Sequence, residues 1–123
     1  MEVKILLDSV ILIDHLNGFA VATEYLRTLD GASVSVITRA EVLTRVPGGA
    51  VGSVTRLLDR YPTLSLDREI ADLAAELRRK FRWRLPDAFQ AALAQVHDLK
   101  LATRNTRDFP PQRHEFVTLP YTL

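Results

Sequence analysis

The chain has 123 residues, of which 47% are hydrophobic and 25% are charged, as is typical of one globular domain and not of a disordered chain. It contains no cysteine, which excludes a disulfide scaffold, a cysteine zinc site and a thiol nucleophile. The net charge is only +1, so any surface that binds nucleic acid has to be local. No apolar run approaches the ~18 residues of a membrane span and no signal peptide is recognised, so we expect a cytoplasmic protein without membrane contacts.

Short apolar runs alternate with segments of helical periodicity along the chain, without a linker or an internal repeat. Residues 3–7 read as a buried strand, and Ser9 is placed to cap a short helix behind it. An alternating segment at residues 33–37 predicts a second strand, and Thr38 is placed to cap the helix that follows and stops at Pro47. The remaining pattern predicts helices at residues 9–15, 19–29, 50–61, 67–82 and 87–97, and strands at residues 63–66, 100–103 and 116–119. This order predicts an α/β fold for a single domain, residues 1–123, with a mainly parallel central sheet flanked by helices.

Acidic and amide side chains stand at the ends of several predicted elements. They are Asp8, Glu41, Asp87 and the pair Asn105 and Asp108. Ligands of open parallel sheets bind beyond the carboxyl ends of the strands, so these side chains could converge at one edge of the sheet. Carboxylates are the ligands that Mg²⁺ or Mn²⁺ prefers, and such an ion activates water and offsets charge on a phosphodiester under attack. The pattern is therefore consistent with a metal-dependent site.

All of these residues except Asp8 also have a purely structural interpretation. Glu41 and Asp87, taken singly, fit acidic residues that cap a helix or interact with its dipole. Asp108 could brace its loop, with Asn105 in a turn. The other acidic residues considered are assigned to exposed helix faces, caps and turns: Asp14, Asp30, Asp59, Asp67 and Asp72.

Four segments resemble, in order, the motifs of the PIN domain family: Leu7-Asp8-Ser9, Thr38-Arg39-Ala40-Glu41, Leu85-Pro86-Asp87-Ala88 and Thr103-Arg104-Asn105-Thr106-Arg107-Asp108-Phe109. The four acids lie 33, 46 and 21 residues apart, and the short chain is similar to VapC, the toxin half of bacterial toxin–antitoxin pairs. The resemblance implies an endoribonuclease that uses Mg²⁺, with Mn²⁺ as the other plausible cation. It also implies an RNA substrate, a cognate antitoxin and a homodimer.

The predicted site follows from these motifs. Asp8, Glu41, Asp87 and Asp108 are the predicted catalytic residues, Asp8 and Asp87 the predicted metal ligands, and Ser9 and Asn105 the supporting residues. Asp108 is the predicted fourth acid, because Asn105 is a poorer cation ligand than a carboxylate.

Basic residues next to these motifs are candidates for contacts with RNA phosphates. They are Arg82, Arg84, Arg104 and Arg107. The first two also fit a solvated helix end, where cations are favoured by the helix dipole.

Two other classes of function are open. Asn105 stands where many PIN domains have an acid, so a catalytically weak PIN-like module that binds RNA or protein is the alternative. A receiver domain fits less well, because no acidic pair accompanies Asp8. The amphipathic segments between residues 19 and 61 could form a groove for a partner peptide, although such faces more often belong to the core.

Overall fold

A computed structural model describes residues 4–123 of the chain, so the first residue of the predicted strand 3–7 lies outside the described residues. The described part contains a parallel sheet of five strands in the order β3-β2-β1-β4-β5. The strands are β1 (Ile5–Leu7), β2 (Ala32–Ser35), β3 (Thr63–Leu64), β4 (Lys100–Ala102) and β5 (Val117–Thr118). This confirms the predicted α/β fold with a mainly parallel sheet.

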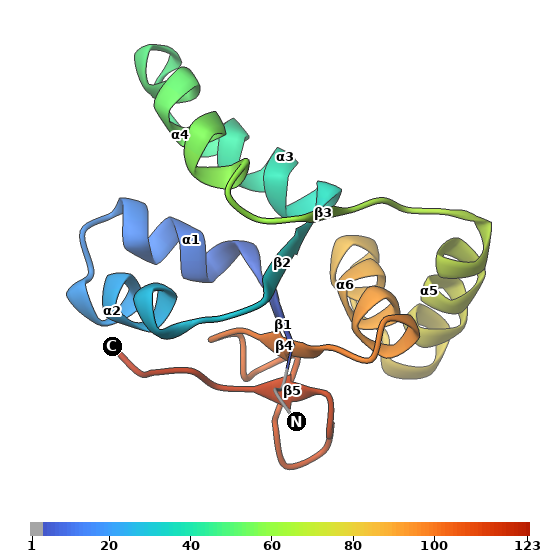
Figure 1. Ribbon diagram of the computed structural model, residues 1–123. Coiled ribbons are helices and arrows are strands. Elements are labelled where there is room, and N and C mark those ends of the chain that lie inside the picture. The colour runs from blue at the N-terminus through green and yellow to red at the C-terminus, as the bar shows by residue number, and fades with distance from the viewer. Residues whose placement is uncertain (1–3) are drawn as a thin grey trace.

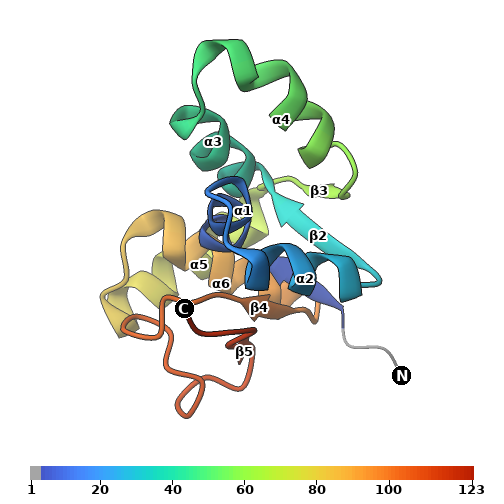
Figure 2. The same ribbon diagram turned by 90° about the vertical axis from the view of Figure 1, so that its left-hand side faces the viewer.

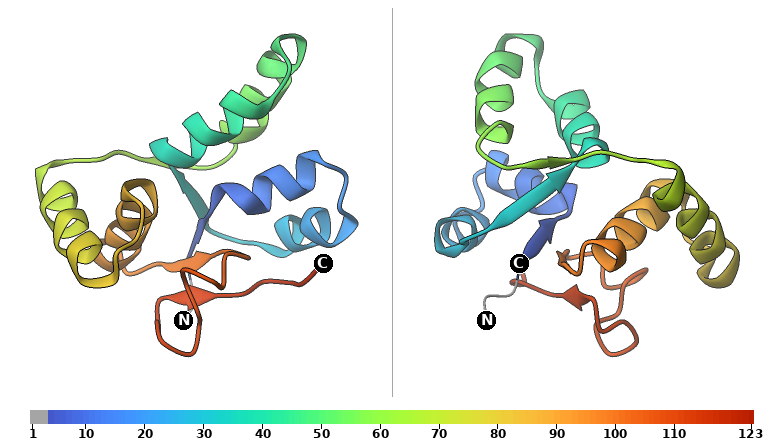
Figure 3. Two further views of the ribbon diagram at one scale, coloured as in Figure 1. Left: turned by 180° about the vertical axis from the view of Figure 1, so that it is seen from behind. Right: turned by 45° about the vertical axis from the view of Figure 1, so that its right-hand side comes forward.

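Helices cover both faces of the sheet (Figures 1 and 3). They are α1 (Ser9–Leu16), α2 (Ala20–Thr28), α3 (Val36–Arg45), α4 (Val51–Leu58), α5 (Arg68–Phe81) and α6 (Leu85–Val96), with a 3₁₀ turn at Gly48–Ala50. Helices α1 and α2 lie on one face, α5 and α6 lie on the other, and the α3–α4 hairpin projects beyond the end of β2 (Figure 1). Within residues 4–123, no helix has the length and apolar character needed to cross a membrane.

The alternation of side chains along β1 divides the core into two clusters. Ile5 and Leu7 pack against α1 and the α3–α4 hairpin, whereas Leu6 packs against α5 and α6. Leu6 and Leu7 are both 0% exposed, and burying a leucine side chain stabilises the fold by about 1.5–3 kcal/mol. A strand that is apolar on both faces is therefore held in place from both sides, which fixes the position of the residue that follows it.

The order of the strands reverses beside β1. From β1 the chain builds β2 and β3 on one side, and it then crosses through α5 and α6 to place β4 on the other side (Figure 2). Leu7 pairs with Ala102, and the backbone N–H of Asp8 donates to the carbonyl oxygen of Ala102 at 3.0 Å. Open α/β sheets bind ligands at such a switch point, beyond the carboxyl ends of the strands.

Two predicted helix caps are wrong. Asp8, not Ser9, is the N-cap of α1, because its carboxylate accepts a hydrogen bond from the backbone N–H of Ser9. Ser35, not Thr38, is the N-cap of α3, because its hydroxyl accepts a hydrogen bond from the N–H of Thr38 at 3.0 Å. The second strand therefore ends at Ser35, although the next two residues are β-branched and favour strands locally.

Candidate active site

Asp8 lies at the switch point between β1 and β4, with only 7% of its surface exposed. Its Oδ1 atom accepts hydrogen bonds from the N–H of Ser9 at 2.9 Å and from Nε2 of Gln90 at 3.3 Å. Its Oδ2 atom accepts a hydrogen bond from the hydroxyl of Thr103 at 2.6 Å. Donors from α1, α6 and the end of β4 therefore fix the carboxylate of Asp8 in one orientation.

Sequence reasoning did not assign a role to Gln90 or Thr103. Both side chains lie inside the quoted motifs, Gln90 three residues after Asp87 and Thr103 at the start of the Thr-Arg-Asn segment. Their positions within these motifs were the signal in the sequence that could have identified them. Residues three apart on a helix share a face, so a polar side chain at position 90 was a candidate to reach the same edge as Asp87.

Asp87 lies in the first turn of α6 and is 8% exposed. Within residues 4–123, its Oδ2 atom has no hydrogen-bond partner, and Nε of Arg84 lies 3.6 Å from that atom in an ion pair. Burial and then the charge of Asp8 raise the pKa of Asp87 to about 6, against the smaller opposing effect of Arg84. Arg84, not Asp87, is the N-cap of α6, and Asp87 lies in the first turn, where the helix dipole favours a carboxylate.

Glu41 and Asp108 also act on Asp87. Their negative charges add to the raised pKa of Asp87, with smaller effects than the charge of Asp8. Glu41 is half-buried and lies in the second turn of α3, beyond the positions where a side chain caps a helix. The charges of the other three predicted carboxylates, which come from three separate segments, therefore all act on Asp87.

The loop after β4 is braced by its own side chains. Nδ2 of Asn105 donates to Oδ2 of Asp108 at 3.0 Å, and the N–H of Asp108 lies 3.4 Å from Oδ1 of Asn105. The indole N–H of the buried Trp83 donates to the carbonyl oxygen of Asp108 at 2.8 Å. Asn105 therefore holds the carboxylate of Asp108 directly, so Asp108 does brace its loop. The charge of the same carboxylate also acts on Asp87.

The donor chemistry of this site fits a hard divalent cation. Among residues 4–123, no group of three or more histidine, aspartate or glutamate side chains is placed to hold a metal ion. Hard cations such as Mg²⁺, however, keep several waters and take only one or two carboxylates from the protein. The buried Oδ2 of Asp87, which has no hydrogen bond from the described residues, is an oxygen that such an ion would satisfy.

The candidate arginines differ in their surroundings. Arg84 is 78% exposed and pairs with Asp87, Arg107 is exposed, and Arg82 is an exposed residue at the C-cap of α5 in the left-handed conformation. Arg104, in contrast, pairs through Nε and a terminal nitrogen with the carboxylate of Asp14. The assignment of Asp14 to an exposed helix face is wrong, because its side chain is buried under this pair.

Comparisons with known proteins agree with this architecture. The family model of the PIN domain matches residues 5–111. The chain is 35% identical over 114 residues, covering 86% of each protein, to Ribonuclease VapC10 of Mycobacterium tuberculosis (strain CDC 1551 / Oshkosh).

Solved structures share the fold. A toxin–antitoxin complex from Klebsiella pneumoniae has a TM-score of 0.87 and 32% identity, covering 98% of this chain and 100% of that one. The structure of FitAcB from Neisseria gonorrhoeae has a TM-score of 0.79 and 24% identity, with the same coverage of the two chains. With the family model spanning most of its length and a relative 35% identical over 114 residues, the chain belongs to the PIN domain family.

Proposed function

We propose that this protein is a metal-dependent endoribonuclease that hydrolyses RNA phosphodiester bonds and forms the toxin half of a toxin–antitoxin pair. The observation that carries the proposal is the carboxylate of Asp87, whose pKa is raised by burial and by the charges of the other predicted acids and whose buried Oδ2 atom has no hydrogen bond within residues 4–123. The likeness to a protein named as a ribonuclease and to a toxin–antitoxin complex supports the same conclusion.

PIN ribonucleases in general depend on a divalent metal ion. For this chain we assign the ion to Asp8 and Asp87, with Mg²⁺ as the cation and Mn²⁺ as its substitute. When bound, the ion supplies a Lewis acid that activates water and offsets the charge that develops on the phosphodiester. Glu41 and Asp108 are the remaining catalytic carboxylates. A carboxylate oxygen beside the scissile phosphate orients the attacking water and accepts its proton while the bond from phosphorus to the leaving oxygen breaks.

Cleavage of a labelled single-stranded RNA tests this proposal. We expect cleavage in the presence of MgCl₂, none in EDTA, and recovery when Mg²⁺ is returned. Asp8→Asn should lower the rate by about 100-fold or more, as for the loss of a positioned catalytic group. Asp67→Asn is the matched control, because the Asp67 side chain caps α5 through the N–H of Ile70 and has no assigned role in the site, and an asparagine caps a helix equally well. Equal rates in the two variants would contradict the assignment.

The alternative is a PIN-like module that binds RNA or protein without efficient cleavage. Asn105 favours it, because a neutral amide lies where a further carboxylate would strengthen cation binding. The same experiment separates the two functions. RNA binding without Mg²⁺-dependent cleavage would support the binding module.

RNA contacts are assigned to the arginines whose side chains are exposed near the acidic site, Arg82, Arg84 and Arg107. Arg104 is left out of this group because its guanidinium is committed to Asp14. Phosphate contacts supply much of the affinity for a nucleic acid, so on a chain of nearly neutral net charge these three exposed arginines are the residues assigned to such contacts.

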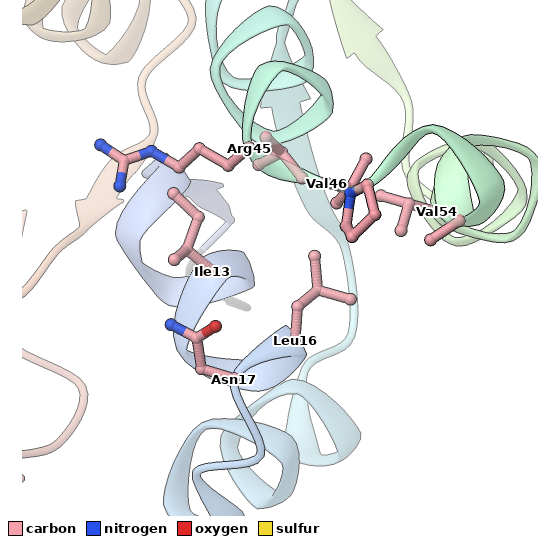
Figure 4. A pocket seen from close by; sticks show the side chains of 9 residues that line it. Ile13, Leu16, Asn17, Arg45, Val46 and Val54 are labelled. Atoms are coloured by element: carbon pink, nitrogen blue, oxygen red, sulfur yellow. The ribbon is translucent and has the colours of Figure 1, made fainter.

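We assign the antitoxin to the pocket between α1, α3 and α4, which has a volume of about 190 Å³ (Figure 4). Its lining is mainly apolar and consists of Ile13, Leu16, Asn17, Val42, Arg45, Val46, Pro47, Ala50 and Val54. The pocket is lined in part by the segments between residues 19 and 61 that were considered for a peptide groove, and in part by α1. A basic side chain from the antitoxin tail would neutralise the acidic site by pairing with its carboxylates.

Co-expression with the product of a small adjacent gene tests this partner. We expect the two proteins to co-purify and the complex to lack nuclease activity. Ala50→Leu should fill the pocket and weaken the complex, whereas Gly52→Ala on the exposed side of α4 should leave it unchanged. Full nuclease activity in the purified complex would contradict the assignment.

We also propose that the protein forms a homodimer, as the PIN resemblance implies. Analytical ultracentrifugation at micromolar concentration measures this directly. A species of twice the chain mass of 13.9 kDa is expected, and a monomer throughout the concentration range would contradict the proposal.

A further inference from the structure

Gln90 is a polar side chain in the middle of the core, on α6 and only 1% exposed. Its amide oxygen accepts a hydrogen bond from the hydroxyl of Ser35 at 2.7 Å. Its amide nitrogen lies 2.8 Å from the hydroxyl oxygen of Thr38 and 3.3 Å from Oδ1 of Asp8. A buried amide costs free energy unless its bonds are satisfied, and here its oxygen and both of its N–H groups have partners.

The neighbouring bonds fix which end of this amide faces Asp8. The N–H of Thr38 donates to the oxygen of Ser35, so the hydroxyl hydrogen of Ser35 is free to point to Gln90. The hydroxyl of Thr38 donates to the carbonyl oxygen of Leu7 at 3.2 Å, so its oxygen accepts from Gln90. The amide oxygen of Gln90 therefore faces Ser35, and its second N–H faces the carboxylate of Asp8.

This arrangement connects the two proposed metal ligands, which lie on different elements. Asp8 follows β1, whereas Asp87 lies on α6 three residues before Gln90 and on the same face of that helix. The bond from Gln90 to Asp8 joins the end of β1 to the helix that carries Asp87. Because Ser35 and Thr38 hold the amide from the start of α3, the separation of the two carboxylates is set by a third element as well.

We propose that Gln90 is a positioning residue that sets the orientation of Asp8 relative to Asp87 and thereby the affinity of the site for a divalent cation. This inference rests on the proposed function, because it assumes that the two carboxylates bind the cation. Gln90 does not itself touch the ion or the RNA. It acts through Asp8, in the way that hydrogen-bond partners of metal ligands generally orient them.

Gln90→Met tests the proposal, because methionine keeps the length and approximate volume of glutamine and removes its donor and acceptor. The measurement is the dissociation constant of Mn²⁺, by calorimetry and by the paramagnetic spectrum of the free ion, in the absence of RNA. Loss of a hydrogen-bond partner of a ligand weakens metal binding by about 10- to 100-fold, which is the expected result. The spectrum of bound Mn²⁺ should also change.

Ile70→Val is the matched control for stability. Ile70 is 1% exposed on α5, in the core cluster that also contains much of α6, and it makes no bond to Asp8. Removing one methyl group there should lower the melting temperature and leave the dissociation constant of Mn²⁺ unchanged. If Gln90→Met binds Mn²⁺ as tightly as the wild type, the positioning role is wrong even though the proposed function stands. If the wild type binds no Mn²⁺, both fail.

A measurement on the wild type keeps the proposal testable if Gln90→Met does not fold. The side-chain amide signals of Gln90 in a ¹⁵N-labelled sample should shift during a Mg²⁺ titration and saturate with the same dissociation constant that calorimetry gives. Amide signals of Gln95, which is exposed at the other end of α6, should stay in place. Unmoved signals of Gln90 at saturating Mg²⁺ would overturn the inference.

Discussion

Arg104 and Asp14 form a two-bond ion pair between parts of the chain that are 90 residues apart, with distances of 2.6 Å from Nε to Oδ2 and 2.8 Å from a terminal nitrogen to Oδ1. The hydroxyl of Tyr121 donates to the same carboxylate at 2.7 Å. Burial raises the pKa of Asp14, but the bonds from Arg104 and Tyr121 outweigh it, so the pKa is lowered overall. This group connects α1, the loop after β4 and the C-terminal segment, which returns toward α2 (Figure 1).

Arg104→Lys should destabilise the protein, because a lysine keeps the charge but cannot make two parallel bonds to a carboxylate. We expect the free energy of unfolding in urea at pH 7 to fall by about 1–3 kcal/mol, the range for losing a hydrogen bond to a buried charged group. Arg107→Lys, in the same loop but exposed, is the control and should change it by less than about 0.5 kcal/mol. Equal stability of the two variants would show that the ion pair contributes nothing measurable.

Asp87→Asn should stabilise the protein near neutral pH. The pKa of Asp87 is raised from 3.8 to about 6 in the folded state, so the folded state binds more protons than the unfolded chain between these values. The contribution of Asp87 to the free energy of unfolding is therefore fully present below pH 4 and is lost as the pH rises through 6. After allowance for solvent screening, the variant should gain about 1–2 kcal/mol at pH 7.5 over the wild type, and about nothing at pH 4.

Urea unfolding at the two pH values measures this effect, and Asp8→Asn is the comparison. Three donors face the carboxylate of Asp8, so an asparagine there presents its own N–H₂ to at least one of them. Asp8→Asn should therefore gain no stability at pH 7.5, although it also removes a negative charge from the site. A gain of equal size in both variants would indicate that charge repulsion alone governs the stability of the site.

Asp108→Asn tests the fourth acidic position. The carboxylate of Asp108 acts on Asp87 and is held by Asn105, so its loss should lower the rate of RNA cleavage by about 10- to 1,000-fold, as expected for one acid–base or water-orienting group. Asn105→Ala frees the same carboxylate without removing it and should have a smaller effect. A wild-type rate in Asp108→Asn together with an inactive Asn105→Ala would identify Asn105 as the functional residue.

Replacing the exposed arginines should weaken RNA binding through the loss of phosphate contacts. We expect each of Arg82→Gln, Arg84→Gln and Arg107→Gln to reduce the slope of log affinity against log salt concentration by roughly 0.7 for a single-stranded RNA. Fluorescence anisotropy with an uncleaved RNA, in the Asp8→Asn background, provides the measurement. Arg60→Gln, exposed after α4, is the control and should leave the slope unchanged. If the three test variants also left the slope unchanged, the RNA would have to bind at another surface.

The sequence by itself determined the order of the elements and the residues at their ends, because these depend on local signals. Asp67 caps α5 through a bond to the N–H of Ile70, three residues away, as the pattern predicted. Pro86 lies in the first turn of α6, where its missing N–H costs nothing. The apolar run at β1 predicted a buried strand, and Asp8 was recognised from its place directly after it.

Only the tertiary structure decided which polar side chains meet. The sequence placed Asp14 among the exposed acidic residues and gave it no partner. Its side chain is buried because Arg104 and Tyr121 bind it from the far end of the chain. Gln90 has no role assigned from the sequence, yet its amide joins α3, α6 and the end of β1. Periodicity and capping are set within a few residues, whereas a buried hydrogen bond depends on where the parallel crossovers bring distant segments together.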